Sequence, residues 1–537
     1  MMKWRSETIK IVLAALFLVL CLAMSGYYLA AGYGAYLDAD MSSELVLAQH
    51  LAGTGRLISP DWLYSTEVRV LNTQLVFTPL MALFGADWQL VRVIGCLILL
   101  ALMAASCVFC ARMIGARMSY ALVFAGIGVL PVSVVYAQMI VIGAYYVPHA
   151  ILTNLMIGLT ACAVKKKRWG VYMALLAVLS LVMGASSIRY LLCAAIPSAA
   201  AGIWMAVFPH GEKLKQDEKR LLAASLGSAA VSVAGYVIGQ KLFGALYTYG
   251  GARYNGSRLI GLMNENLFDL LDQALDGLIK LMGFLEGRIM LSVSGLLSVG
   301  VLGLLSLSVL LCMRAAKAEE SKGCAARRYG LLALVFSAAV TLFTFVFVDD
   351  LYLNRYWLPV MTLGAPVMAM CLSRERRCAL RMLSLAAFVC VVLGLSAVQI
   401  RSSMNNPEIN EADWYNAQTV RESGLTMGYA TFWNANVMTE LTDGEVEVVS
   451  MTIIRNAQDQ AYPEMSVWLE TQENIRENRP DEPVFLLLSA NEALELAPFL
   501  DACAAQKRPL AGEWLQMYVV ESQHRYFETI ACFDRGQ

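Results

Sequence analysis

The composition of this chain excludes an ordinary soluble domain. Of its 537 residues, 58% are hydrophobic and only 15% are charged, whereas soluble domains carry about 25% charged residues. The net charge of −1 hides an acidic tail, residues 401–537, with 9 basic and 22 acidic side chains. A tail with that excess of negative charge argues against nucleic acid as a partner and against docking on anionic lipid.

Long apolar runs predict a polytopic α-helical membrane protein, because about 20 apolar residues cross a bilayer core. We expect about eleven transmembrane helices, at residues 10–31, 88–111, 118–138, 147–164, 169–187, 190–208, 221–242, 289–313, 329–348, 357–373 and 382–400. Alternate connections are rich in Lys and Arg, which predicts that they and the N-terminus lie in the cytoplasm. An odd number of spans then makes the tail extracytoplasmic. We therefore predict a multi-pass protein of the cell membrane with a transmembrane domain (1–400) and an extracytoplasmic α/β domain (401–537).

The first long outer segment, residues 32–87, carries carboxylates at the start of a predicted helix. Residues 41–52 have helical spacing of apolar side chains, and Gly53 or Gly55 is the expected stop. Asp38 and Asp40 precede this helix, and Glu44 shares a face with Asp40. Two interpretations stay open: Asp40 or Ser42 simply caps the helix, or Asp40 is held at the membrane surface for acid–base chemistry. Residues 69–84 form a second, Pro-containing apolar stretch, predicted as a juxtamembrane helix.

The second long outer segment, residues 243–288, begins with two adjacent glycines, tyrosines, Arg253 and Arg258, a composition typical of an irregular segment that a ligand can reach. An amphipathic stretch follows, with leucines on one face and aspartates on the other. It predicts an interfacial helix, which is either a packing element or part of a site.

Arginine followed by tyrosine occurs at two predicted outer span ends, Arg189-Tyr190 and Arg355-Tyr356. Arginine on the outer side runs against the positive-inside bias. A guanidinium binds phosphate through two parallel hydrogen bonds and stays charged, so these positions are candidates for holding a phosphate. The alternative is that each side chain extends along the membrane surface without a ligand.

The tail has mixed α/β character. Strand-like runs are Leu425–Phe432, Glu445–Ile454, Val484–Ser489, Met517–Glu521 and Tyr526–Phe533, and helix-like runs are 410–422 and 491–506. This alternation predicts a small sheet flanked by helices. Cys503 and Cys532, the only two cysteines of the tail, are a candidate disulfide pair, since an exported domain meets an oxidising compartment.

Several outer motifs occur together in a recognisable order. They are Asp40 eight residues before Ala48, the short helix with Pro79 before the second span, Arg92 opening that span, and Arg355-Tyr356-x-x-Pro359. This arrangement resembles the GT-C superfamily of membrane glycosyltransferases, which includes protein O-mannosyltransferases and lipid A aminoarabinose transferases. Two positions depart from the family: Met41 replaces a Glu, leaving Asp38 as the acidic partner, and residues 72–74 replace a Lys-Pro-Pro.

The resemblance implies an inverting glycosyltransferase acting on the outer face of the membrane. Its donor would be a polyprenyl-phosphate sugar, and its acceptor a glycan, lipid or protein of the cell envelope. Asp40 is the expected general base, and burial beside Asp38 and Glu44 is expected to raise its pKa. The expected donor phosphate-binding residues are Arg355, Tyr356 and Arg189, with Arg253 and Arg258 as lesser candidates. The three carboxylates are also candidate ligands for a divalent cation, and metal dependence stays open.

Two other classes of function are consistent with a polytopic chain. A lipid or polysaccharide transporter or flippase would usually carry mid-membrane charges or internal repeats. The predicted spans contain almost no charge and show no repeat. A non-catalytic membrane scaffold for the tail would tolerate loss of the carboxylates in the first outer segment, so substitution of Asp40 separates it from a transferase.

Overall fold

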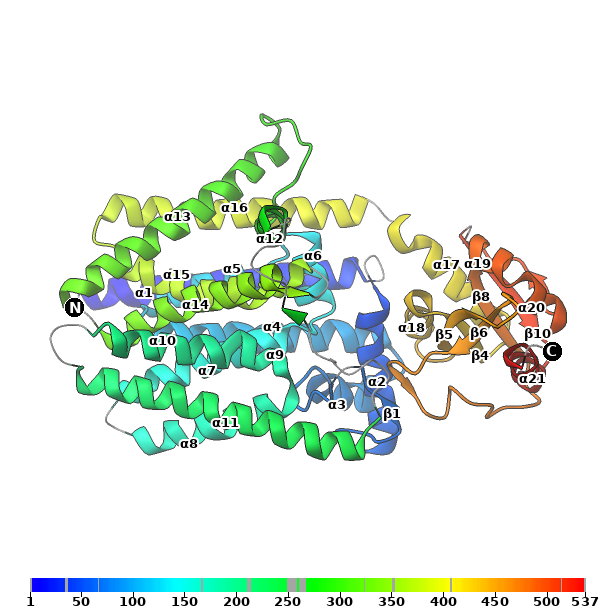
Figure 1. Ribbon diagram of the computed structural model, residues 1–537. Coiled ribbons are helices and arrows are strands. Elements are labelled where there is room, and N and C mark those ends of the chain that lie inside the picture. The colour runs from blue at the N-terminus through cyan, green and yellow to red at the C-terminus, as the bar shows by residue number, and fades with distance from the viewer. Residues whose placement is uncertain are drawn as a thin grey trace.

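The computed structural model describes residues 2–33, 37–65, 67–165, 168–209, 214–248, 258–259, 267–322, 324–349, 353–405, 408–512 and 514–535. Within these ranges the chain is mostly helical up to residue 405, and a six-stranded sheet follows (Figure 1). The long helices lie side by side with the N-terminus at one end of the bundle. The tail lies beyond the other end, which we call the α2 end because helix α2 crosses it.

Ten helical segments among the described residues are long and apolar enough to cross a membrane, which agrees with ten of the predicted spans. Many of their Leu, Val and Ile side chains face outward, as contact with lipid requires. The helices are α1 (Met2–Ala31), α4 (Trp88–Met113), α7 (Val147–Ala161), α8 (Trp169–Ser186), α9 (Ile188–Tyr190) continuing into α10 (Ile196–Val207), α11 (Gln216–Leu246), α13 (Val293–Lys322), α14 (Ala325–Phe347), α15 (Leu358–Arg374) and α16 (Cys378–Asn405).

The remaining predicted span, residues 118–138, is not one continuous helix. Helix α5 (Met118–Gly128) ends before Pro131, whose ring and missing N–H break a helix. The carbonyl of Ile142 nevertheless accepts a hydrogen bond from Arg92 in the first turns of α4. Helix α5 begins just after the end of α4, and Ile142 lies beside the beginning of α4. Residues 118–142 therefore run back along the length of α4, but as an interrupted helix. Its later pieces are α6 (Val134–Tyr136) and the π-helical turn Ala137–Ile142.

Three shorter helices lie outside the spans: α2 (Ala39–Thr54), α3 (Gln74–Phe84) and α12 (Leu267–Leu281). All three confirm helices predicted in the outer segments. Gly55 ends α2 in the left-handed conformation, φ 65°, which glycine adopts without steric cost. The amphipathic α12 buries Ala274, Gly277 and Leu281, and the carbonyl of Ala274 accepts a hydrogen bond from the indole of Trp357.

The tail forms a mixed six-stranded sheet with the strand order β6-β5-β4-β8-β10-β9. Its strands are β4 (Met427–Thr431), β5 (Glu447–Arg455), β6 (Ala461–Met465), β8 (Val484–Ser489), β9 (Gln506–Arg508) and β10 (Leu515–Val520). Strand β4 is parallel to β5 and β8, and the other pairs are antiparallel. The flanking helices are α17 (Glu408–Glu422), α18 (Phe432–Leu441), α19 (Ala490–Glu495), α20 (Ala497–Ala502) and α21 (Gln523–Asp534). Four predicted strands and both predicted helical runs are thereby confirmed.

Two predictions for the tail are wrong. The run Tyr526–Phe533, predicted as a strand, belongs to helix α21. Ser522 caps this helix by accepting a hydrogen bond from the backbone N–H of Arg525, and Tyr526 and Phe533 reach the core at helical spacing. Cys503 and Cys532 are both free thiols, so the candidate disulfide does not form.

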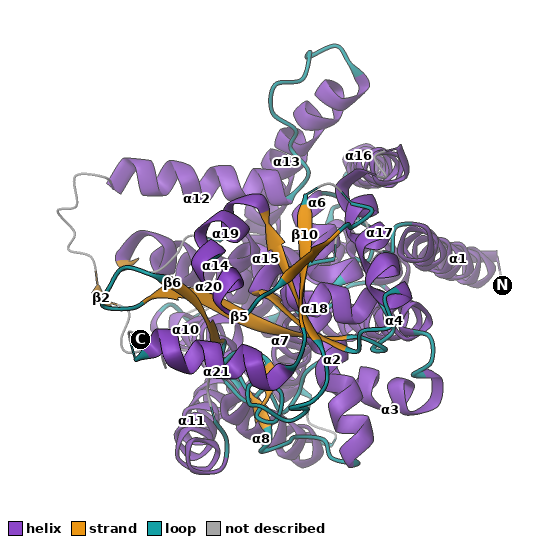
Figure 2. Cartoon of the chain, turned by 90° about the vertical axis from the view of Figure 1, so that its right-hand side faces the viewer, coloured by secondary structure: helices purple, strands orange, loops and turns teal. Residues whose placement is uncertain are grey.

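The tail packs directly on the α2 end of the helix bundle. Figure 2 shows this face, with α18 in front of α2. Val437 of α18 belongs to the same buried apolar cluster as the membrane helices. A second contact comes from the short strand β7 (Glu470–Thr471), which pairs antiparallel with β1 (Trp62–Leu63) of the first outer segment. The tail therefore contacts the segment that carries the predicted catalytic carboxylates.

Candidate active site

The first turn of α2 separates the roles of the two aspartates. Asp38 is the N-cap, and its Oδ1 accepts a hydrogen bond of 2.8 Å from the backbone N–H of Met41. Capping therefore falls to Asp38, which leaves the carboxylate of Asp40 available for another partner. Burial raises the pKa of Asp38 to about 6, with a smaller contribution of the same sign from Asp40 and an opposing one from the Met41 hydrogen bond.

The partner of Asp40 is Arg355, which lies 315 residues further along the chain. The Arg355 Nη1 and Asp40 Oδ2 atoms are 3.7 Å apart, and the two side chains are 25% and 31% exposed. Arg355 lies in the short 3₁₀ turn Asn354–Trp357 that leads into α15. Two of the predicted site residues therefore lie together, at a depth that solvent still reaches.

Two tyrosines link Arg355 to the second predicted arginine. The Arg355 Nη1 donates to the hydroxyl of Tyr145 over 3.4 Å, and its guanidinium lies 5.9 Å from the ring centre of Tyr146. Arg189 donates to the hydroxyl of Tyr146, also over 3.4 Å. The site thus combines one carboxylate, two guanidinium groups and two phenols.

Tyr145 and Tyr146 were not among the residues that the sequence singled out. They follow the π-helical turn, and Ala144 before them has a φ of 57°, a conformation that L-residues rarely adopt and that occurs often at functional sites. The adjacent pair Tyr145-Tyr146, two residues before Pro148 at the start of a predicted span, is the signal that could have identified them.

Glu44 has a structural partner rather than a place beside Asp40. Its buried carboxylate accepts hydrogen bonds from the side-chain amide of Asn72, 3.3 Å away, and from the hydroxyl of Thr73. Burial is the main cause that raises the pKa of Glu44. Asn72 and Thr73 therefore tie α2 to the start of α3.

Of the other predicted residues, Tyr356 and Arg258 lie in described parts of the chain. Tyr356 stacks on Phe345, with ring centres 5.8 Å apart. The backbone of Arg258 lies in the short strand β2 (Arg258–Leu259), opposite Asp349 of the antiparallel strand β3 (Val348–Asp349). Arg253 lies outside the described residues. Within the described part of the chain, no three His, Cys, Asp or Glu side chains come together as ligands for a metal.

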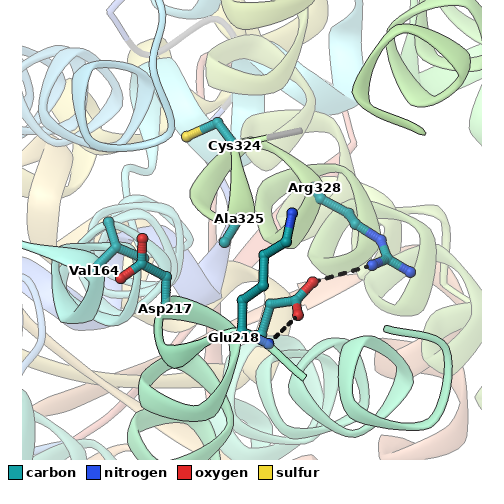
Figure 3. Close-up of a pocket in the computed structure, with 7 residues that line it drawn as sticks. Val164, Asp217, Glu218, Cys324, Ala325 and Arg328 are labelled. Atoms are coloured by element: carbon teal, nitrogen blue, oxygen red, sulfur yellow. Dashed lines mark hydrogen bonds and ion pairs between the residues drawn. The ribbon is translucent and has the colours of Figure 1, made fainter. Parts of the chain in front are cut away.

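A small cavity of about 120 Å³ lies at the far end of the bundle from this cluster, where α7 ends and α11 and α14 begin. Glu218 pairs with Arg328 over 3.5 Å and also accepts a hydrogen bond from the backbone N–H of Lys215 (Figure 3). Because Glu218 of α11 is paired with Arg328 of α14, the arrangement has the character of a packing contact between the two helices.

The fold resembles that of solved proteins whose sequences are only 11–12% identical to this one. No family model and no curated protein matches the chain. ArnT from Cupriavidus metallidurans bound to undecaprenyl phosphate matches with a TM-score of 0.56 at 11% identity, over 95% of this chain and 98% of ArnT. The apo state of the same ArnT gives 0.57 at 12%, over 94% and 97%.

This chain has the fold of ArnT. The Archaeoglobus fulgidus oligosaccharyltransferase also matches, with a TM-score of 0.45 at 12% identity, over 89% of this chain and 67% of that chain. Because the likeness to ArnT covers nearly the whole of both chains, the GT-C-like arrangement includes the tail as well as the membrane helices.

Proposed function

We propose that this chain is a membrane glycosyltransferase that moves a sugar from a polyprenyl-phosphate donor to a cell-envelope acceptor. The observation that carries the proposal is the carboxylate of Asp40 facing Arg355, with Arg189 joined to the same cluster through Tyr146. The likeness to ArnT, which was solved bound to undecaprenyl phosphate, supports the class of donor. In this proposal residues 1–400 form the transferase domain and 401–537 an extracytoplasmic domain.

Each group has a role in an inverting transfer. The acceptor hydroxyl oxygen attacks the anomeric carbon of the donor, and the bond from that carbon to the phosphate oxygen breaks. Asp40 takes the hydroxyl proton, and the polyprenyl phosphate leaves with the bonding electron pair. Arg355 and Arg189 stabilise the charge that develops on the phosphate, an electrostatic contribution that is usually large. No nucleotide is required, because the leaving group is the lipid phosphate.

The decisive experiment replaces Asp40 by Asn. The change is nearly isosteric and Asp38 still caps α2, so the fold should be retained. We expect transfer to fall by about 10²–10⁴-fold, the usual contribution of a positioned proton acceptor. Transfer would be measured from radiolabelled undecaprenyl-phosphate sugars into membranes with matched expression.

Asp38→Asn is the control, because Asn is as good a cap as Asp. It should cost less activity than the change at residue 40. Full activity of the Asp40 variant beside a dead Asp38 variant would move the base two residues upstream. Full activity of both variants would contradict the transferase and favour a non-catalytic scaffold for the tail.

A further inference from the structure

A fully buried ion pair joins the tail to the membrane helices. Glu440 of α18 and Arg92 of α4 are both 0% exposed. Their contact is a two-armed fork, with Nε to Oε1 at 2.5 Å and Nη2 to Oε2 at 2.6 Å. The hydroxyl of Tyr33 donates to the same carboxylate over 3.2 Å. The charge of Arg92 is thus neutralised by a residue of the tail, 348 positions away.

The other donors of Arg92 hold the backbone on both sides of the candidate site. Nη2 donates to the carbonyl of Met41 over 3.0 Å, and Nη1 donates to the carbonyl of Ile142 over 3.1 Å. Met41 is the neighbour of Asp40 in the first turn of α2. Ile142 ends the π-helical turn that leads to Tyr145 and Tyr146. One guanidinium therefore fixes the segment of the base relative to the segment of the phenols.

The tail has a separate attachment close to this pair. The side chain of Asp443 accepts a hydrogen bond of 3.0 Å from the backbone N–H of Trp88 at the start of α4. A Cβ added to Gly444 would lie 2.7 Å from the ring of Trp88, so the two surfaces are in close contact there. Attachment of the tail to α4 therefore does not depend on Glu440 alone.

We propose that Glu440 is a positioning residue of the active site. By orienting and neutralising Arg92, it sets the distance between Asp40 and the tyrosine–arginine cluster. If the ion pair only attached the tail, Arg92 would not need to donate hydrogen bonds to the segment of Asp40 and to the segment of the two tyrosines as well. The inference rests on the proposed transfer reaction, for which a displacement of about 1 Å can cost 10²-fold in rate.

Glu440→Asp is the sharpest variant, because it keeps the charge while shortening the side chain by one methylene, so that the fork cannot form with both arms. We expect kcat to fall about 10–100-fold, while KM for the donor changes less than about threefold. Glu440→Gln should lose at least as much. Asp443→Ala is the matched control: it removes the attachment to Trp88 without touching Arg92, and should keep kcat within about twofold.

A second measurement that does not depend on sugar transfer distinguishes loss of positioning from loss of folding. Amide hydrogen exchange of the purified full chain should show faster exchange at residues 41–45 and 142–146 in Glu440→Asp, with no change there in Asp443→Ala. Wild-type kcat and exchange in Glu440→Asp would overturn the positioning role, and so would an equal loss of kcat in Asp443→Ala. If wild-type protein transfers no sugar but Glu440→Asp still loosens both segments, the proposed reaction fails and the positioning of the two segments stands.

Discussion

At the scale of single residues, the contacts of Arg355 are loose enough to be exchanged. Its distances of 3.7 Å to Asp40 and 3.4 Å to Tyr145 exceed the usual length of about 2.8 Å for a charge-assisted hydrogen bond. The two non-bridging oxygens of the donor phosphodiester would offer the guanidinium better partners. Binding of the donor would then draw Arg355 away from Asp40 and free the carboxylate for the proton of the acceptor.

We expect Arg355→Ala to weaken binding of undecaprenyl phosphate about 10–100-fold, and Arg355→Lys to weaken it less. Lysine keeps the charge but lacks the planar fork that matches a phosphate. Affinity would be measured by titrating the purified protein with the lipid. Equal binding by all three forms would mean that the side chain only extends along the membrane surface.

Asp38 should make the stability of the fold depend on pH, because its pKa is about 6 in the folded protein and about 3.9 in an unfolded chain. The folded state holds the proton more tightly, so folding is favoured at low pH and this contribution is lost as pH rises from about 4 to 6. Asp38→Asn cannot ionise and still caps α2. Wild-type protein should therefore lose up to about 2 kcal/mol relative to this variant between pH 4 and 7. Melting temperatures at several pH values measure the difference, and parallel curves would contradict it.

At the scale of elements, hydropathy predicted the continuous helices and failed where the backbone is irregular. Residues 118–138 are predominantly apolar, so Pro131 alone did not outweigh the length of the run. The π-helical turn and Ala144 depend on contacts with α2 and α4 that no local pattern encodes. Similarly, Tyr526–Phe533 is rich in residues that favour strands. The segment is nevertheless helical, because Ser522 caps the helix and Tyr526 and Phe533 pack into the core at helical spacing.

We expect Gly143→Ala to displace Tyr145 and weaken binding of undecaprenyl phosphate about tenfold. The added Cβ would lie 2.6 Å from the carbonyl oxygen of Gln138 and 2.8 Å from Cγ of Met41, so the backbone must shift. Gly128→Ala is the control, since a Cβ there meets no atom within 4 Å. Unchanged binding in the Gly143 variant would mean that the turn does not set the position of the phenols.

At the scale of the whole molecule, the sequence predicted an acidic α/β tail but not where it docks. The pair formed by Asp40 and Arg355 could be anticipated, because each residue belongs to an outer segment with a recognisable motif. Glu440 could not, since it lies within a helix of the tail that no motif marks, and burial of its charge becomes favourable only beside Arg92. Contacts between residues so far apart in sequence emerge only from the assembled fold.

The predicted orientation can be tested with thiol chemistry. Leu494 is 78% exposed in the tail, whereas the exposed Cys378 lies at the opposite end of the bundle. A membrane-impermeant maleimide added to intact cells should label Leu494→Cys in a background where Cys378 and Cys532 are both replaced by Ser. It should leave Cys378 of a Cys532→Ser variant unlabelled until the cells are opened. The reverse pattern would place the tail in the cytoplasm.

The buried pair of Arg92 and Glu440 also has a consequence for biogenesis. Arg92 emerges from the ribosome about 350 residues before its counter-ion, and an unpaired charge is costly to bury. We therefore expect its surroundings to stay hydrated until α18 has been synthesised and has docked. Nascent chains that stop short of residue 440 should consequently remain open at this end and inactive, so that the site is completed only once α18 is in place.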